Sequence, residues 1–227
     1  MRKVILFIAV LFSLGCQAQK PGSVNNIRPN PSRPKPTPPK TSRPKPEPPK
    51  EPVSPQPSKA TGTINGHGYV DLGLPSGLKW ATCNVGANRP EEYGDYFAWG
   101  ETSPKSSYDE ENSETYGKDN SWLQRNGYID SYGDLTMAHD AARANWGSSW
   151  RLPTKDEIDE LVENTTTKWT TVNGKEGRLV TSKRNGKSIF LPSAGYRYGT
   201  PLNGAGEDGY SWSTTPFERD ATRAYYL

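Results

Sequence analysis

Proline is distributed very unevenly along this 227-residue chain, and its distribution limits where a fold can form. Fourteen of the 21 prolines lie between residues 21 and 57, a segment that contains the near-repeats SRPKPTPPK (32–40) and SRPKPEPPK (42–50). Proline fixes its own φ and has no amide hydrogen, so such a segment favours polyproline II over helix or sheet. Residues 19–59 are therefore predicted to be a disordered Pro/Lys-rich linker, about 120 Å long when extended, and residues 60–227 to be the folded domain.

Charge divides the chain at the same place. Residues 20–59 contain nine Lys or Arg and two Glu, whereas residues 60–227 contain 17 basic and 23 acidic side chains. The overall charge of +3 therefore hides a basic linker and an acidic domain. An acidic domain argues against nucleic acid as a partner, because phosphate binding needs a basic face. The basic linker leaves contact with an anionic surface open.

The first 18 residues have the pattern of an export signal. Arg2 and Lys3 precede an apolar run, residues 4–14, that is too short to span a bilayer but suits a secretory signal. Residues 13–16 resemble a lipobox with its leucine displaced by one position, so we expect cleavage before Cys16 and acylation of that residue. Cleavage after Ala18 is the alternative. Acylation predicts a lipoprotein of the outer membrane or cell surface whose only membrane contact is this anchor; otherwise the protein is periplasmic or secreted.

Export affects how the linker and the remaining cysteine are interpreted. Proline-rich runs in exported proteins are typically stalks, although a ligand for a proline-binding module is the alternative. Cys83 is the sole cysteine after residue 16, so the folded domain is predicted to have no internal disulfide. Its apolar surroundings in WATCNV favour a small buried hydrophobic side chain over a reactive thiol.

Three segments before residue 150 have interpretable patterns. Residues 68–82 hold two short apolar pieces around a Pro and Gly turn, which predicts a β-hairpin. Residues 135–144 are rich in helix formers and precede Asn145 and Gly147, which predicts a short helix. The polar residues 100–133 are predicted to be surface loop. Their acidic cluster lacks EF-hand spacing and is interpreted as solvated rather than Ca²⁺-binding: Asp109, Glu110, Glu111 and Glu114.

The stretch WRLPTKDEIDEL, residues 150–161, predicts the start of a second helix. Pro153 disfavours helical dihedrals at the residue before it, so the helix begins later. Thr154 and Glu157 have the spacing of a capping box, in which each side chain bonds the other's amide. An apolar stripe follows at helical spacing: Ile158, Leu161 and Val162. Thr154, Glu157 and Trp150 are therefore assigned structural rather than catalytic roles.

After this helix the pattern predicts strands. Three segments are rich in β-branched and apolar residues: 169–172, 177–183 and 187–191. Between the last two, Asn185-Gly186 is expected to supply the left-handed dihedrals of a tight hairpin. Residues 195–227 contain five Gly and many aromatic residues, which suggests short strands between long loops. Helices in the middle with strands on both sides predict an α+β fold.

Several strings are similar to those of one known family. NWGSSWRLPTKDEIDEL is preceded by VDLGLPSGLKWATCNVGANRPEEYGDYFAWGET and followed by NGKSIFLPSAGYRYGTPL and GYSWSTT. Together they resemble the Fibrobacter succinogenes major paralogous domain family of exported Bacteroidetes proteins, over nearly all of residues 68–227. The resemblance implies a C-type-lectin-like fold, related to formylglycine-generating enzymes and to variable proteins of diversity-generating retroelements. Such a fold has a twisted antiparallel sheet, two short helices and a long loop-rich binding face.

The chain departs from that family in two places. Relatives often carry a Cys shortly after the second helix, where this chain has Asn164 to Thr167, so the resemblance implies that any bridge from Cys83 is lost. Relatives also continue beyond the Ala-Tyr-Tyr-Leu string, whereas this sequence stops at Leu227. We therefore expect the last strand of the family fold to be missing.

The sequence favours a binding module over an enzyme. Related enzymes use a cysteine pair or histidine-ligated iron, and Cys83 with His67 and His139 supplies neither. No G-x-S-x-G elbow is present, and two isolated His make a catalytic zinc site improbable. The string GAGEDG, residues 204–209, resembles a dinucleotide fingerprint but lacks the strand and helix unit around it, so we interpret it as a loop. We expect no catalysis, metal or cofactor.

The resemblance places the ligand face in the late loops. The aromatic and polar residues there suit recognition of an unknown protein or glycan: Tyr196, Arg197, Tyr198, Asn203, Asp208, Tyr210 and Trp212. Tyr196 and Trp212 also fit a role in the core, because both lie in family strings. The Glu-Pro-Asn motif of calcium-dependent sugar binding is absent.

Four hypotheses for function remain. The first is an exported, surface-displayed binding or adhesion domain. The second is a receptor whose tail is diversified by a retroelement, which a nearby reverse transcriptase and a template repeat would reveal. The third is an exported enzyme of unknown reaction, for which no residue can be nominated. The fourth is an inactive, truncated paralogue.

Overall fold

The computed structural model describes residues 55–217, 220 and 222–227. The predictions for the export signal, for Cys16 and for most of the linker lie outside the described residues. The described part is α+β, as predicted, but it has several small antiparallel sheets and three short α-helices rather than one sheet and two helices. No helix in this part has the length and apolar character needed to cross a membrane.

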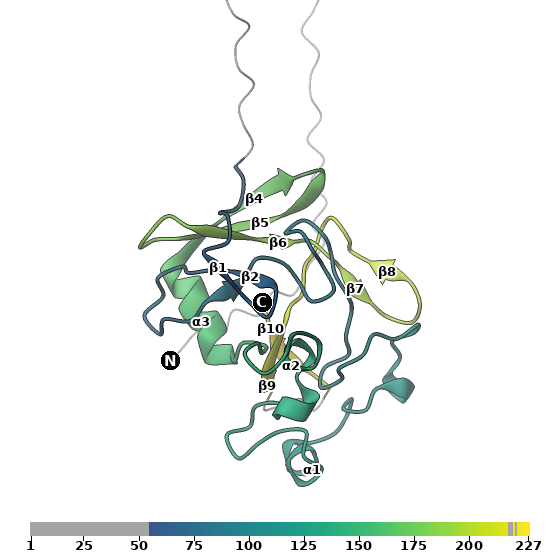
Figure 1. The fold of residues 1–227 in the computed structure, drawn as a ribbon. Helices are drawn as coiled ribbons and strands as arrows, with labels where there is room; N and C mark the ends of the chain where they lie inside the picture. The colour runs from purple at the N-terminus through teal and green to yellow at the C-terminus, as the bar shows by residue number, and fades with distance from the viewer. Residues whose placement is uncertain (1–54, 218–219, 221) are drawn as a thin grey trace, which may run out of the picture. The chain divides into compact units, whose positions relative to one another are not determined.

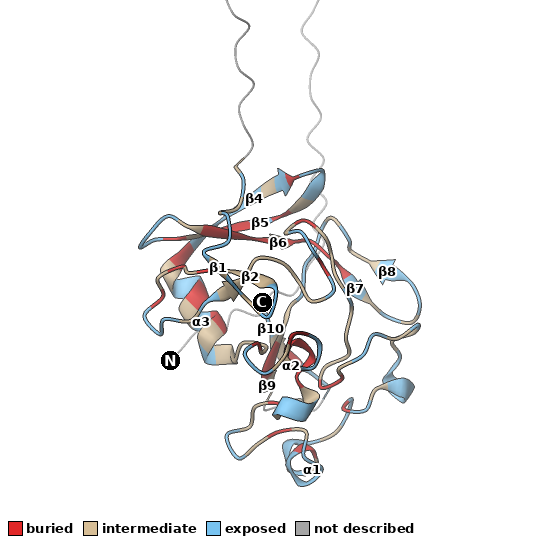
Figure 2. Cartoon of the chain, viewed as in Figure 1, coloured by how far each residue is buried: buried red, intermediate tan, exposed pale blue. Residues whose placement is uncertain are grey.

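The most regular element is the three-stranded antiparallel sheet β4–β5–β6 (Figure 1). Its strands are Thr165–Val172, Lys175–Ser182 and Ser188–Pro192, so all three predicted strands are found with altered ends. β5 and β6 bury most of their side chains, whereas β4 lies at the edge and is largely exposed (Figure 2). Phe190 and Leu179 pack with Val172 in one small core.

Asn-Gly pairs form two of the tight turns, but not the one predicted. Asn173 (φ 47°) and Gly174 (φ 80°) connect β4 to β5 with both residues left-handed, as a two-residue hairpin loop requires. At the predicted position only Gly186 is left-handed. The Asn185 side chain donates instead to the Asp71 carbonyl over 3.0 Å, so this turn is longer and is fixed by a distant segment.

The first sheet contains one predicted and one unpredicted hairpin. β2 (His67–Val70) pairs antiparallel with β3 (Trp80–Ala81), which confirms the hairpin predicted for residues 68–82. β1 (Gly62–Ile64) joins β2 through the left-handed pair Asn65-Gly66 and was not predicted. β1 has only three residues, too few for its periodicity to be seen in the sequence.

The helix predicted for residues 135–144 is interrupted. A 3₁₀ turn covers Met137–His139, and α2 then runs from Ala141 to Trp146 before Gly147 (φ 92°). Asp140 separates the two because its carboxylate accepts from the amides of Arg143 (3.1 Å) and Leu152 (2.9 Å). Aspartate used as an N-cap begins a new helix rather than continuing the previous one.

α3 (Lys155–Asn164) begins as predicted. Thr154 Oγ1 accepts from the Glu157 amide, and Glu157 Oε2 accepts from the Thr154 amide over 2.9 Å, which confirms the capping box. Ile158 and Leu161 are buried, and α3 packs against β4, β9 and β10. Val162 is 54% exposed, so its predicted place in the apolar stripe is wrong.

Residues 100–133 are mostly loop, as predicted, but they also contain α1 (Asn120–Arg125) and a 3₁₀ turn, Glu110–Asn112. Asp119 caps α1, and Leu123 is its sole buried residue. One apolar anchor gives no periodic pattern, which explains why this helix was missed. All four carboxylates of the acidic cluster, residues 109–111 and 114, are exposed, as a solvated loop requires.

The tail forms short strands between loops, as predicted. β7 (Tyr196–Arg197) pairs with β8 (Leu202–Asn203), and β9 (Trp212–Pro216) pairs with β10 (Ala224–Tyr226). β9 connects distant parts of the domain, because the Thr214 amide donates to the Pro153 carbonyl and the Thr214 carbonyl accepts from Leu135. This arrangement brings the tail to the start of α3 and to the loop before α2.

Candidate functional site

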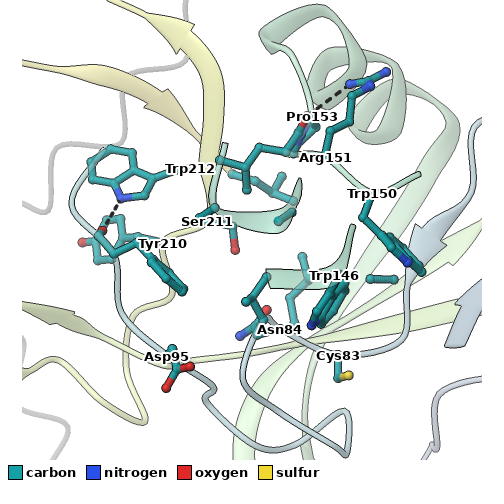
Figure 3. A pocket seen from close by; sticks show the side chains of 18 of the residues that line it. Cys83, Asn84, Asp95, Trp146, Trp150, Arg151, Pro153, Tyr210, Ser211 and Trp212 are labelled. Carbon is teal, nitrogen blue, oxygen red and sulfur yellow. Dashed lines mark hydrogen bonds between the residues drawn. The ribbon is translucent and has the colours of Figure 1, made fainter. Parts of the chain in front are cut away.

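A cavity of about 510 Å³ lies where these segments meet (Figure 3). Its walls come from β3, the loop of residues 83–101, α2, the strand β6 and the segment 194–212. Aromatic side chains supply much of the lining: Tyr69, Trp80, Tyr93, Tyr96, Phe97, Trp99, Tyr108, Trp146, Trp150, Phe190, Tyr196, Tyr210 and Trp212. A concave, mainly apolar cavity with a few polar groups is the usual form of a ligand site.

Two tryptophans fix the loop of residues 83–101 to the tail. Trp99 Nε1 donates to the Ser213 carbonyl, and Trp212 Nε1 donates to the Phe97 carbonyl, both over 2.9 Å. The two bonds run in opposite directions between the same two segments. They set the separation of the two walls, although the segments are more than 100 residues apart in sequence.

Tyrosines and a third tryptophan hold the remaining walls. The Tyr96 hydroxyl donates to the Ala194 carbonyl over 2.5 Å, and the Tyr108 hydroxyl donates to the Tyr96 carbonyl. Trp150 is 8% exposed and its Nε1 donates to the Ile64 carbonyl over 3.0 Å. Trp150 therefore joins β1 to the segment before α3 and also lines the cavity.

Three partly exposed tyrosines of the tail contact one another in a row. The rings of Tyr196 and Tyr210 meet edge to face at 5.7 Å between centroids, and those of Tyr210 and Tyr226 at 5.1 Å. Each side chain is more than 40% exposed. Burial, followed by the charge of Asp208, raises the pKa of Tyr210, so its hydroxyl stays protonated. Tyr196 and Tyr210, the two members of the row that line the cavity, offer aromatic faces and hydroxyl donors at its rim.

Most charged groups that line the cavity already have partners. Arg151 forms two hydrogen bonds to the Glu157 carboxylate, at 2.6 and 2.5 Å. Burial opposes ionisation of Glu157, but hydrogen bonds from Arg151 and the Thr154 amide outweigh it and lower its pKa below 4.5. Glu101, which lines the cavity, pairs with Lys105, which does not, over 2.7 Å between Oε2 and Nζ.

Asp95 and Asn84 differ from these paired groups. Within the described residues, the Asp95 carboxylate forms no hydrogen bond or ion pair, and it is exposed at the cavity. Asn84 donates through Nδ2 to the Tyr93 carbonyl over 2.9 Å. Figure 3 shows Asp95 and Asn84 on one side of the opening and Ser211 near Trp212 across it. These are the groups that a polar ligand would meet.

The structure brings together four of the seven predicted ligand residues. Tyr196, Arg197, Tyr210 and Trp212 line the cavity. The Arg197 guanidinium lies 5.0 Å from the centre of the Tyr96 ring and donates to the Thr200 carbonyl. The Nε1 of Trp212 is used in a structural hydrogen bond, and its ring borders the cavity (Figure 3).

The other three predicted residues lie elsewhere. Tyr198, 61% exposed, lines a neighbouring cavity of about 270 Å³ together with Arg197 and Trp212. Asn203 and Asp208 line neither cavity. Asn203 is the last residue of β8, and Asp208 lies in the loop that follows. This region is tied back by bonds from the Gly206 amide to the Ser193 carbonyl and from the Gly195 amide to the Asp208 carbonyl. The interpretation of the GAGEDG string as a loop is confirmed.

Sequence reasoning missed the wall formed by residues 80–101. Trp80, Tyr93 and Tyr96 face the same cavity as the tail tyrosines, and so do Asn84 and Asp95. The signal was present in the string EEYGDYFAWGE, which contains four aromatic residues. The string alone does not show which of them face a cavity, because that depends on contacts with the tail.

Cys83 packs against the core cluster of Trp146 and Trp150, but it is only half-buried and also lines the cavity, so its burial is less complete than predicted. Its Sγ lies 3.3 Å from the Ala87 carbonyl, and burial raises its pKa. A protonated thiol is a poor nucleophile. No group of three or more His, Cys, Asp or Glu among the described residues could hold a metal ion.

Comparison of the chain with models of protein families, with curated proteins and with solved structures gave no match. A function must therefore be argued from the cavity and from the sequence.

Proposed function

We propose that residues 60–227 form a non-catalytic binding or adhesion domain, displayed outside the cytoplasm behind the Pro-rich linker. The export pattern of residues 1–18 and the lipobox-like Cys16 support display on an outer membrane or cell surface. The ligand is a glycan or a protein segment that presents flat or apolar groups.

The observation that carries this proposal is the aromatic cavity itself. Its volume, about 510 Å³, suits a ligand of a few sugar rings or amino-acid side chains. Tyr196 and Tyr210 expose ring faces and hydroxyls at its rim, a combination that binds with little loss of side-chain entropy. Arg151 and Glu157 are hydrogen-bonded to each other. This pairing stabilises the wall and does not leave either group free for catalysis.

We also propose that the domain has a C-type-lectin-like fold. Small antiparallel sheets, short helices and a loop-built cavity in the tail are all consistent with it. In addition, the string WRLPT that carries the family resemblance contains the buried Trp150 and the helix cap Thr154, as a scaffold motif should.

The decisive experiment is a screen of the exported chain on glycan and protein arrays. Binding is then measured for Tyr196→Ala and Tyr210→Ala, and for the matched control Tyr132→Ala. Tyr132 is 91% exposed and lines neither cavity. We expect the first two variants to lose at least tenfold in affinity, about 1.4 kcal/mol, and the control to bind normally. Absence of any array ligand, or binding that both site variants retain, would contradict the proposal.

A further inference from the structure

The β4–β5–β6 sheet has two edges, and the described residues cover only the β6 edge. There the Ser58 amide donates to the Ser188 carbonyl over 3.0 Å, and Ser58 Oγ accepts from the Ser188 amide over 2.9 Å. At the other edge, β4 pairs only with β5 among the described strands. An open strand edge is a template for another strand, and natural proteins normally block it.

The backbone hydrogen bonds show which β4 residues point outward. The Ser182 amide donates to the Lys187 carbonyl, and the Glu176 carbonyl accepts from Ser193, so even-numbered residues of β5 face β6. Odd-numbered residues of β5 therefore face β4, and the register pairs them with even-numbered residues of β4. Thr167, Trp169 and Thr171 thus direct their N–H and C=O groups away from the sheet.

This edge has few of the usual protections. The ladder with β5 runs through eight consecutive pairs without a bulge, and β4 carries a single charged residue, Lys168. Trp169 is 45% exposed. The Arg178 guanidinium lies 5.9 Å from the centre of the Trp169 ring. None of the β4 residues lines either cavity.

Three of the outward residues of β4, Thr167, Trp169 and Thr171, read the same in both directions. A two-fold axis between identical antiparallel strands places one residue opposite its own copy. An axis at Lys168 would bring two like charges together, whereas an axis at Trp169 does not. With Trp169 at the axis, Thr167 lies opposite Thr171 of the second copy, and Thr171 lies opposite Thr167 of the second copy. Threonine pairs and aromatic pairs are both favourable across strands. In this register Lys168 faces Thr170 of the second copy, so no like charges are directly opposed.

We propose that β4 pairs with β4 of a second copy of this chain, joining two three-stranded sheets into one six-stranded sheet about Trp169. The Trp169 rings of the two copies meet at the axis, and each is flanked by its own Arg178. One pair of short strands buries much less than the roughly 1,200 Å² of a stable interface. The dimer is therefore weak in solution and is favoured where copies are concentrated side by side on a surface.

Sedimentation of the exported chain over a range of concentrations tests this proposal. We expect a shift from monomer to dimer, with a dissociation constant in the range of about 1 μM to 1 mM. Thr167→Pro removes one outward N–H and is tolerated in an edge strand, so it should raise that constant at least tenfold. Trp169→Ala should do the same. Tyr132→Ala, which removes an exposed aromatic ring elsewhere, should leave it unchanged.

A cross-linking experiment tests the register. Thr167→Cys and Thr171→Cys are prepared separately, and each is oxidised alone and in mixture. The mixture alone should give a disulfide-linked dimer above background, because residue 167 lies opposite residue 171 and far from its own copy. A chain that stays monomeric throughout would overturn the proposal, and so would a dimer unaffected by both Thr167→Pro and Trp169→Ala, or equal cross-linking in all three samples.

Discussion

The β4–β5–β6 sheet and the loops around the cavity are held together in different ways. The sheet is built from neighbouring segments, whose two hairpins fix the pairing of β4 with β5 and of β5 with β6. The cavity walls are fixed by hydrogen bonds between segments more than 100 residues apart, such as Trp99 to Ser213 and Trp212 to Phe97. Pairing between neighbouring segments therefore determines most of the sheet, with the Asn185 turn fixed by Asp71 as the exception, whereas tertiary contacts determine the site.

This difference predicts how each region responds to mutation. A buried apolar residue of the sheet contributes through packing, and its loss leaves a cavity that neighbours cannot fill. The loop region depends on single polar groups that satisfy several backbone amides at once. Rim residues of the cavity contribute neither to the packing of the sheet nor to the bonds with backbone amides. Substituting them should therefore change ligand binding while leaving the free energy of unfolding nearly unchanged.

The largest effect is expected from Leu179→Ala in the sheet. Leu179 is 7% exposed and packs with Phe190 and Val172, so its truncation should reduce the free energy of unfolding by about 2–5 kcal/mol. Urea unfolding followed by tryptophan fluorescence measures the change. Leu202→Ala, in the exposed β8 strand, is the control and should cost less than about 1 kcal/mol. Equal losses in the two variants would show that this sheet is not the more strongly packed region.

The next largest effect should come from Asp140→Ala in the loop region. Asp140 is 1% exposed, and its carboxylate accepts from the amides of Arg143 and Leu152. Its removal leaves both amides without an acceptor and should cost about 2–3 kcal/mol. Asp119→Ala removes the exposed cap of α1 and should cost about 1 kcal/mol. If both substitutions had the same small effect, Asp140 would be only a helix cap.

The same difference decides what the sequence could predict. Thr154 and Glu157 form their capping box within four residues, so local spacing was sufficient. The Asn-Gly rule was insufficient at Asn185, because the Asn185 side chain donates a hydrogen bond to the carbonyl of the distant Asp71. Of the site, the tail tyrosines were predicted from composition and family resemblance. Tyr96 and the rest of the opposite wall were not, because no local pattern encodes a bond between Trp99 and Ser213.

Glu157→Gln tests the junction between the two regions. At pH 7 it replaces the carboxylate that accepts from Arg151 and from the Thr154 amide, and should cost about 2 kcal/mol. The folded pKa of Glu157 lies below 4.5, so its stabilisation is complete above that pH and is lost as pH falls through the lowered pKa. The difference between the variant and the wild type, measured by urea unfolding, should shrink as the pH is lowered below 4.5. A difference independent of pH would exclude this carboxylate as the cause.

Thr154→Ala should have a smaller effect at the same junction. It removes the oxygen that accepts from the Glu157 amide but leaves the pairing of Arg151 with Glu157. We expect a loss of about 1 kcal/mol, seen as a lower melting temperature. Thr154→Ser retains the acceptor and should restore most of the loss. An unchanged melting temperature in the alanine variant would contradict the capping assignment.

The smallest effect on stability is expected where the effect on binding is largest. Tyr196 is 45% exposed and its ring contacts Tyr210 edge to face, so Tyr196→Ala should change the free energy of unfolding by no more than about 0.5 kcal/mol. A rim residue that is unimportant for folding but necessary for ligand affinity belongs to a binding surface, whereas a residue whose loss lowers both belongs to the scaffold. Thermal unfolding and array binding of the same preparation distinguish the two. A fall in stability comparable to that of Leu179→Ala would place Tyr196 in the core, the alternative role that its position in a family string suggested.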